Sequence, residues 1–246
     1  MTDRARVPWF HFVANRLLHI VAPILLKLDV EGMENVPQTG PVIAAFNHTS
    51  FLDSVLLAAY LRWDVLPMAK VELFKLPTGL IFYGYGAFPI RRGEGDLSAL
   101  RRALGVLKEN HVMLISPEGT RTKSGAMEPA REGAALIAIK SGAPILPIGI
   151  WGGKQLATNM SKLRRTKVGI RIGDPLTVVA APAKPNRHVL RQVTDELMYY
   201  LARLVPAEYR GVYADAESIV PQFVFPEGRS LPNEEQPKQL EVVAMR

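Results

Sequence analysis

The stretch "PVIAAFNHTSFLDS", residues 41–54, carries the clearest structural signal in the sequence. Its first six residues form an apolar run of strand character, and a helical pattern begins at Phe51. Ser50 and Asp53 have the spacing of a capping box, in which two side chains close the first turn of a helix. The stretch therefore predicts a strand that is followed at once by a capped helix.

The same alternation continues along most of the chain. It predicts one α/β domain over residues 28–204, with a largely parallel central sheet flanked by helices and ligands bound at the carboxyl ends of the strands. Beyond it, a polar tail over 205–246 is expected to wrap the surface or to lack order near its end. The predicted strands are 41–46, 64–69, 86–90, 112–116, 144–151 and 167–173, and the predicted helices are 51–62, 95–109, 129–141 and 186–204.

The composition narrows the classes of function. With 48% hydrophobic residues among 246, the chain can bury a full core, which excludes a disordered protein. A net charge of +7 favours an anionic partner such as a membrane surface, a phosphorylated substrate or nucleic acid. Because the sequence has no recognised nucleic-acid-binding motif, we expect no nucleic-acid partner. It has no cysteine, and its five histidines lack metal-ligand spacing, so we expect no metal and no cofactor.

The N-terminal stretch "RVPWFHFVANRLLHIVAPILLKL" is rich in apolar and aromatic residues. Arg16, His19, Pro23 and Lys27 interrupt it well short of the ~20 apolar residues that a membrane-spanning helix needs. No small-residue cleavage site follows, so it is not typical of a signal peptide. We expect residues 1–27 to form an amphipathic membrane anchor, as one interfacial helix or as a hairpin bent at the proline. The alternative is an ordinary amphipathic helix packed on the core.

His48 and Asp53 admit two interpretations. In the first, Asp53 only caps the helix, and the histidine is incidental. In the second, the carboxylate reaches back to one ring nitrogen of His48, fixes the tautomer and lets the other nitrogen take a proton from a hydroxyl group. The sequence has no cysteine nucleophile and no Gly-x-Ser-x-Gly elbow. Such a dyad would therefore activate the hydroxyl of a substrate for direct attack.

Two further stretches place charged residues at predicted strand ends. In "LISPEGTRTKSG", residues 114–125, Glu118 and Arg121 lie on a loop whose amide groups and guanidinium suit a phosphate. A surface turn with solvated charges is the alternative. In "GAFPIRRG", residues 86–93, neighbouring side chains of a strand point to opposite faces. At most one of Arg91 and Arg92 is therefore expected to face a pocket.

Taken together, the four blocks "NHTSFLD", "GAFPIRRG", "SPEGTR" and "APILPIGI" resemble, in order, those of the glycerolipid acyltransferase family, especially the bacterial lysophosphatidic acid acyltransferases. The resemblance covers about residues 30–175. It implies an α/β fold with a pair of N-terminal helices in the membrane interface. It also implies that His48 is the general base, that Asp53 orients it, and that the acceptor is held by Arg92, Glu118, Gly119, Thr120 and Arg121. Family members often carry an acidic residue where this chain has Arg91, so which arginine meets the phosphate stays open.

The implied reaction is transfer of a fatty acyl group from a thioester, acyl-CoA or acyl carrier protein, to lysophosphatidic acid at the cytoplasmic face of the cell membrane. The thioester is a co-substrate rather than a bound cofactor. Another lysophospholipid acceptor and a non-catalytic lipid-binding protein are the alternatives. A run of six basic residues without an acidic one is expected either to meet anionic lipid or the acidic donor, or to be a solvated loop. These residues are Lys154, Lys162, Arg164, Arg165, Lys167 and Arg171.

Overall fold

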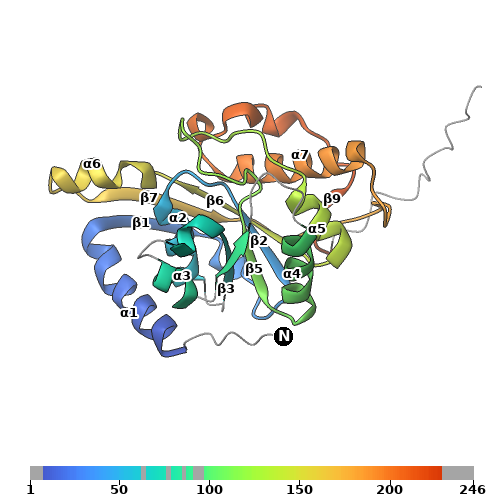
Figure 1. The fold of residues 1–246 in the computed structure, drawn as a ribbon. Helices are drawn as coiled ribbons and strands as arrows, with labels where there is room; N and C mark the ends of the chain where they lie inside the picture. Colours follow the sequence, from blue (N-terminus) through green and yellow to red (C-terminus); the bar gives the residue numbers. More distant parts are fainter. Residues whose placement is uncertain (1–7, 62–64, 76–78, 85–86, 91–96, 229–246) are drawn as a thin grey trace, which may run out of the picture.

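The computed structural model describes residues 8–61, 65–75, 79–84, 87–90 and 97–228. Within these residues, one mixed sheet lies between two layers of helices (Figure 1). The helices are α1 (Pro8–Leu25), α2 (Phe51–Tyr60), α3 (Gly79–Gly84), α4 (Leu97–Lys108), α5 (Gly133–Ser141), α6 (Leu156–Ser161) and α7 (Arg187–Leu204). The strands are β1 (Leu26–Glu31), β2 (Val42–Phe46), β3 (Val65–Lys70), β4 (Phe88–Ile90), β5 (Val112–Ile115), β6 (Ile145–Trp151), β7 (Thr166–Ile172), β8 (Leu176–Val178) and β9 (Val224–Pro226).

The sheet is mostly parallel. Its order is β1-β7-β6-β2-β5-β3-β4, and β2 at its centre runs parallel to both of its neighbours, β6 and β5. At one side β7 runs antiparallel to β6 and parallel to the edge strand β1, while β8 and β9 extend the sheet from β6 by antiparallel pairing. The predicted α/β class, with a largely parallel sheet flanked by helices, is confirmed.

Strand β2 shows why its sequence is an unbroken apolar run. All five of its residues are buried, and alternate side chains enter different cores. Val42, Ala44 and Phe46 pack in the core that α1 and α2 cover. Ile43 and Ala45 pack in the core that α4, α5 and α7 cover. A strand covered by helices on both faces gains from apolar residues at every position, because neither face meets water.

Most of the predicted elements are present with ends that shift by one or two residues. The exception is the helix predicted over 129–141, which begins only at Gly133. The preceding residues are bound elsewhere: the amide of Ala130 donates to the Tyr213 hydroxyl and the amide of Arg131 to the carbonyl of Pro117. These long-range bonds hold the segment as a loop, so the prediction was wrong at this boundary.

The N-terminal segment is one helix in the described residues, rather than a hairpin or a pair. Helix α1 continues through Pro23 and passes directly into β1. Its inner face packs on α2, where the rings of His19 and Tyr60 meet edge to face. Its outer face carries apolar side chains that are each more than half exposed, namely Phe12, Val13, Leu17, Ile20 and Ile24. Among the described helices, none is both long and apolar enough to cross a membrane.

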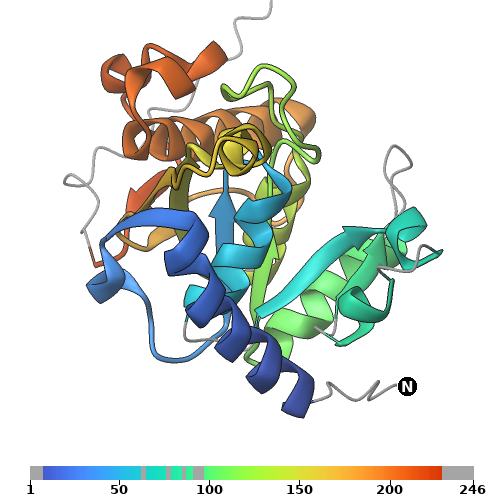
Figure 2. The ribbon, with the colours of Figure 1, turned by 90° about the vertical axis from the view of Figure 1, so that its left-hand side faces the viewer.

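Residues 206–228 pack on α7 (Figure 2). Tyr213 and Ala216 are buried against this helix, and β9 pairs with β8. Glu196 of α7 is buried, and its carboxylate accepts hydrogen bonds from the backbone amides of three successive residues, 222–224. The remainder of the expected tail, from residue 229, lies outside the described residues.

Candidate active site

The site begins where β2 ends, at the carboxyl edge of the parallel strands. Asn47 is fully buried, and its side-chain amide makes two hydrogen bonds to Ile150 of β6, each 2.8 Å long. These bonds continue the pairing of β2 with β6 by one more step, through a side chain. The residue that follows, His48, is therefore held at a fixed place above the sheet.

Helix α2 begins with the predicted capping box. The Ser50 hydroxyl accepts the amide of Leu52 at 3.2 Å. Oδ2 of Asp53 accepts the amides of Thr49 and Ser50 at 2.7 and 2.6 Å. These bonds satisfy amides that have no partner within the helix, and the carboxylate also complements the positive end of the helix dipole. The capping interpretation of Asp53 is confirmed.

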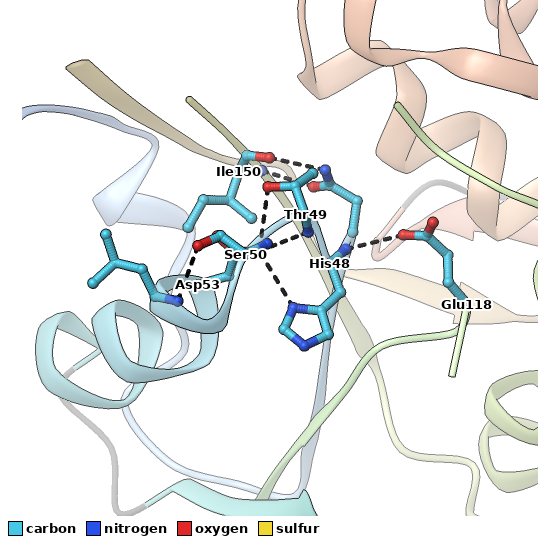
Figure 3. Close-up of polar contacts among 8 residues, drawn as sticks. His48, Thr49, Ser50, Asp53, Glu118 and Ile150 are labelled. Carbon is cyan, nitrogen blue, oxygen red and sulfur yellow. Dashed lines mark hydrogen bonds and ion pairs between the residues drawn. The ribbon is translucent and has the colours of Figure 1, made fainter. Parts of the chain in front are cut away.

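The same carboxylate also contacts the imidazole of His48. Nδ1 of His48 lies 3.3 Å from Oδ2 of Asp53 (Figure 3). The aspartate is completely buried, whereas the side chain of His48 keeps 14% of its surface exposed. Figure 3 shows the second ring nitrogen, Nε2, directed away from Asp53. One oxygen atom thus both caps the helix and contacts the ring, so the cap does not exclude the contact that the second interpretation requires.

The second oxygen of Asp53, Oδ1, is buried and has no hydrogen-bond partner in the described part of the chain. It faces Gly153, where a β-carbon would lie 3.3 Å from this oxygen and equally close to the Cβ of Ser50. A side chain at position 153 would therefore press on the carboxylate. Because both contacts to the histidine and the cap use Oδ2, a small rotation of the carboxylate would disturb both together.

Glu118 fastens the histidine loop from the opposite side. It follows β5, it is buried, and its Oε1 accepts the backbone amide of His48 at 2.9 Å while Oε2 accepts that of Glu128 at 2.9 Å. The carbonyl of His48 in turn accepts the amide of Thr122 at 2.9 Å. Burial raises the pKa of Glu118 to about 7. The sequence indicated a substrate-facing carboxylate here and gave no sign of these backbone contacts.

Arg121 and its neighbours form the outer part of the same loop. A turn closed by the bond from the Gly119 amide to the Ser116 carbonyl gives Gly119 a φ of +71°, a conformation that glycine adopts without strain. Thr120 and Arg121 follow it and are exposed. Among the described residues, Arg121 has no ion pair, so its guanidinium is available to an anionic ligand. Arg91 and Arg92 lie outside the described residues.

The C-terminal segment, residues 206–228, holds the far end of the loop that contains Glu118 and Arg121. No sequence pattern indicated these contacts. The Met127 amide donates to the carbonyl of Tyr209 at 2.9 Å, and the Met127 carbonyl accepts from residue 212. Ala130 donates its amide to the Tyr213 hydroxyl at 3.1 Å, and its carbonyl accepts Arg191 of α7 at 2.8 Å. A tyrosine and an arginine remote in sequence carry no local signal, so only the folded chain identifies them as supports of the site.

The geometry suits an enzyme that activates a hydroxyl group, because a histidine contacts a buried carboxylate at the carboxyl end of a parallel strand. The family model described as acyltransferase matches residues 27–151, a little over half of the chain. This chain belongs to the acyltransferase family.

Individual relatives agree with the family. A chloroplastic 1-acyl-sn-glycerol-3-phosphate acyltransferase of Brassica napus is 33% identical over 161 residues, which span 63% of this chain and 46% of that protein. The enzyme of the same name from Bacillus subtilis (strain 168) is 28% identical over 193 residues, or 76% of this chain and 92% of its own length. This chain thus spans about half the length of the plant relatives and most of the length of the Bacillus subtilis enzyme.

A solved structure supports the same assignment. The 1-acyl-sn-glycerophosphate (LPA) acyltransferase PlsC from Thermotoga maritima is similar with a TM-score of 0.57 and 27% sequence identity. The similarity covers 77% of this chain and 75% of that one. It therefore extends beyond the segment that the family model matches.

Proposed function

We propose that this protein transfers a fatty acyl group from a thioester donor to the free hydroxyl of lysophosphatidic acid, which gives phosphatidic acid. The observation that carries the proposal is the contact between Nδ1 of His48 and Oδ2 of Asp53 at the carboxyl end of β2, with Nε2 directed away from Asp53. The resemblance of the chain to 1-acyl-sn-glycerol-3-phosphate acyltransferases supports the choice of acceptor.

In the proposed reaction, Nε2 of His48 takes the proton of the acceptor hydroxyl as that oxygen attacks the thioester carbonyl. Asp53 keeps the other proton on Nδ1 and stabilises the imidazolium that forms. The tetrahedral intermediate then collapses, the bond between carbon and sulfur breaks, and the imidazolium returns the proton to the leaving thiolate. Direct transfer is the proposed route, because the sequence has neither a cysteine nucleophile nor a Gly-x-Ser-x-Gly elbow to form an acyl-enzyme.

The acceptor phosphate is assigned to Arg121, whose guanidinium is exposed on the loop that Glu118 ties to His48. In this assignment the acceptor phosphate binds Arg121 and the acceptor hydroxyl binds His48. The carboxylate of Glu118 joins the two segments that carry these residues, and Gly119 and Thr120 form the turn between Glu118 and Arg121. A second contact from Arg92, or from Arg91, stays part of the proposal. Glu118 itself is used by two backbone amides, which favours a role in positioning.

The donor is acyl-CoA or acyl carrier protein, and the place of action is a membrane surface. The exposed apolar side chains of α1 support a peripheral, monotopic attachment in which this face enters the interfacial region. We expect the cytoplasmic face of the cell membrane, which is the location that the resemblance to the family implies.

Acyl transfer by the purified protein tests the proposal. Labelled acyl-CoA and acylated acyl carrier protein are each supplied with lysophosphatidic acid, and the phosphatidic acid formed is measured by mass spectrometry. His48→Ala is the inactive control. If lysophosphatidylcholine or lysophosphatidylglycerol is acylated faster, that lipid is the acceptor, and only the choice of acceptor in the proposal is wrong. Binding of lysophosphatidic acid without any transfer from either donor would mean a lipid-binding protein, and the catalytic proposal would be wrong.

A further inference from the structure

The turn between α6 and β7 exposes an apolar residue in an unusual way. We call residues 160–165 the α6 tip. Leu163 is 98% exposed and has a φ of +50°, and Met160 is 47% exposed. Bonds from the amides of residues 163 and 164 to the carbonyls of 160 and 159 close the turn. Leucine is rarely found in this left-handed conformation, which glycine and asparagine adopt at a lower cost in energy. This leucine makes the turn less stable, and at 98% exposure it gains almost no packing against the described part of the chain.

The tip is also strongly basic. Between Lys154 and Gly173 the chain has no acidic residue. Lys162, Arg164 and Lys167 are exposed around the leucine. Exposed apolar side chains among lysine and arginine are typical of segments that enter the interfacial region of an anionic membrane. A purely solvated loop would explain the cations and leave the leucine unexplained.

The structure fixes the tip relative to α1. The guanidinium of Arg165 donates from Nε and Nη2 to the carbonyl of Leu26, at 3.1 and 2.6 Å. Leu26 is the first residue after α1, so the tip is bound directly to the end of that helix. Figure 1 shows α1 and α6 at the same side of the molecule, and Figure 2 looks onto that side. The α6 tip and helix α1, which both carry exposed apolar residues, thus lie at one side of the protein.

We propose that the α6 tip is a second membrane-contact element, which inserts Leu163 and Met160 below the headgroups and places its cations against anionic phosphates. This proposal rests on the proposed function only in taking a lipid bilayer as the partner. Two contact points define a line on the membrane, whereas α1 alone leaves the protein free to roll about the helix axis. The tip would therefore fix how the edge of the sheet that carries His48 meets the lipid.

Vesicle binding by the full chain tests the proposal. Vesicles of phosphatidylcholine alone and of equal parts phosphatidylcholine and phosphatidylglycerol are sedimented with the wild type and with Leu163→Asn and Leu163→Glu. Asparagine adopts the left-handed conformation readily, so Leu163→Asn keeps the turn. We expect both variants to lower the partition constant by about tenfold or more on both vesicle types, because each removes a leucine side chain that the bilayer would bury. Val220→Glu, in a residue that is 83% exposed on the C-terminal segment, is the matched control.

The cations are tested separately. Lys162→Glu with Arg164→Glu should weaken binding to the anionic vesicles by about fivefold or more per residue and leave neutral vesicles nearly unchanged. If Leu163→Asn binds both vesicle types as tightly as the Val220→Glu control, the proposal is wrong. It is also wrong if the double variant keeps its vesicle binding while the KM for acyl-CoA or acyl carrier protein rises, because the surface would then hold the donor.

The two proposals fail in different ways. Sedimentation needs no turnover, so the membrane contact is measured whether or not the protein acylates lysophosphatidic acid. Leu17→Glu, on the exposed face of α1, serves as the positive comparison and should weaken binding to both vesicle types. Loss of binding in this variant, together with unchanged binding in Leu163→Asn, would leave α1 as the membrane contact and remove the tip.

Discussion

The two loops that build the site are held in different ways. The cap region, residues 47–53, combines the local bonds of Asp53 to Thr49, Ser50 and His48 with distant bonds from Asn47 to Ile150 and from the His48 amide to Glu118. The loop region, residues 116–131, depends on partners far along the chain, including His48, Tyr209, Tyr213 and Arg191. The contact between Asp53 and His48 is thus set locally, whereas the placing of both loops depends on the whole fold. Substitutions at His48 and Asp53 should therefore change the chemistry, and substitutions in the loop region should change substrate binding.

The largest effect is expected at His48. Loss of a general base lowers the rate by about 10²–10⁴-fold, so His48→Ala should reduce kcat by that factor and leave folding and acceptor binding intact. Asp53→Asn should also lose most of the activity, since it misorients the ring while it keeps much of the cap. Turnover and circular dichroism of both variants measure this. A folded His48→Ala protein with nearly normal acyl transfer would remove the mechanism.

The next effect is expected in the loop region, at Arg121. Loss of a charge-assisted contact to phosphate should cost about 2–4 kcal/mol of acceptor binding, seen as a raised KM for lysophosphatidic acid with kcat much less changed. Arg187→Ala, which removes an exposed arginine at the start of α7, controls for net charge. Equal KM values for Arg121→Ala and this control would contradict the assignment of the phosphate.

Glu118, which joins the two regions, should make stability depend on pH. Its pKa is about 7 in the folded protein and near 4.5 in the unfolded chain, so the folded state binds the proton more tightly. The free energy of unfolding should therefore fall as pH rises between these values, by on the order of 3 kcal/mol in total. Glu118→Gln does not titrate and should lack this component. Urea unfolding of both proteins from about pH 5 to pH 8 measures the difference, and parallel curves would disprove it.

The smallest effects sharpen the contrast between local and remote support. Ser50→Ala removes one bond of the cap and should cost about 1 kcal/mol of stability with KM unchanged. Tyr213→Phe leaves the Ala130 amide without its partner and should cost a similar amount, about 1–3 kcal/mol, but should also raise the KM for the acceptor. Thermal unfolding and acceptor kinetics distinguish them. If both variants change stability alone, the C-terminal segment does not position the loop.

This contrast also explains what the sequence could predict. The strand and the capping box are patterns of a few neighbouring residues, so the sequence predicted them, whereas the contact of Asp53 with His48 was one of two interpretations that the spacing left open. The parallel sheet followed from alternating apolar runs. The partners of Glu118 are the backbone amides of His48 and Glu128, and a backbone amide, which every residue except proline possesses, leaves no mark in the sequence. Likewise, the prediction that a helix begins at residue 129 was wrong because the Ala130 amide donates to the Tyr213 hydroxyl, and no local sequence pattern indicates that bond.

The pairing of the first strand has a consequence for the order in which the chain folds. Glu31 of β1 lies opposite Arg171 of β7, 140 residues further on, and the two form an ion pair. Such distant pairing must wait until most of the chain is synthesised, and contacts of this kind slow folding. During that interval α1 has no completed sheet beside it. If α1 is the membrane contact that we propose, the edge of the sheet is then completed on a helix that already meets lipid.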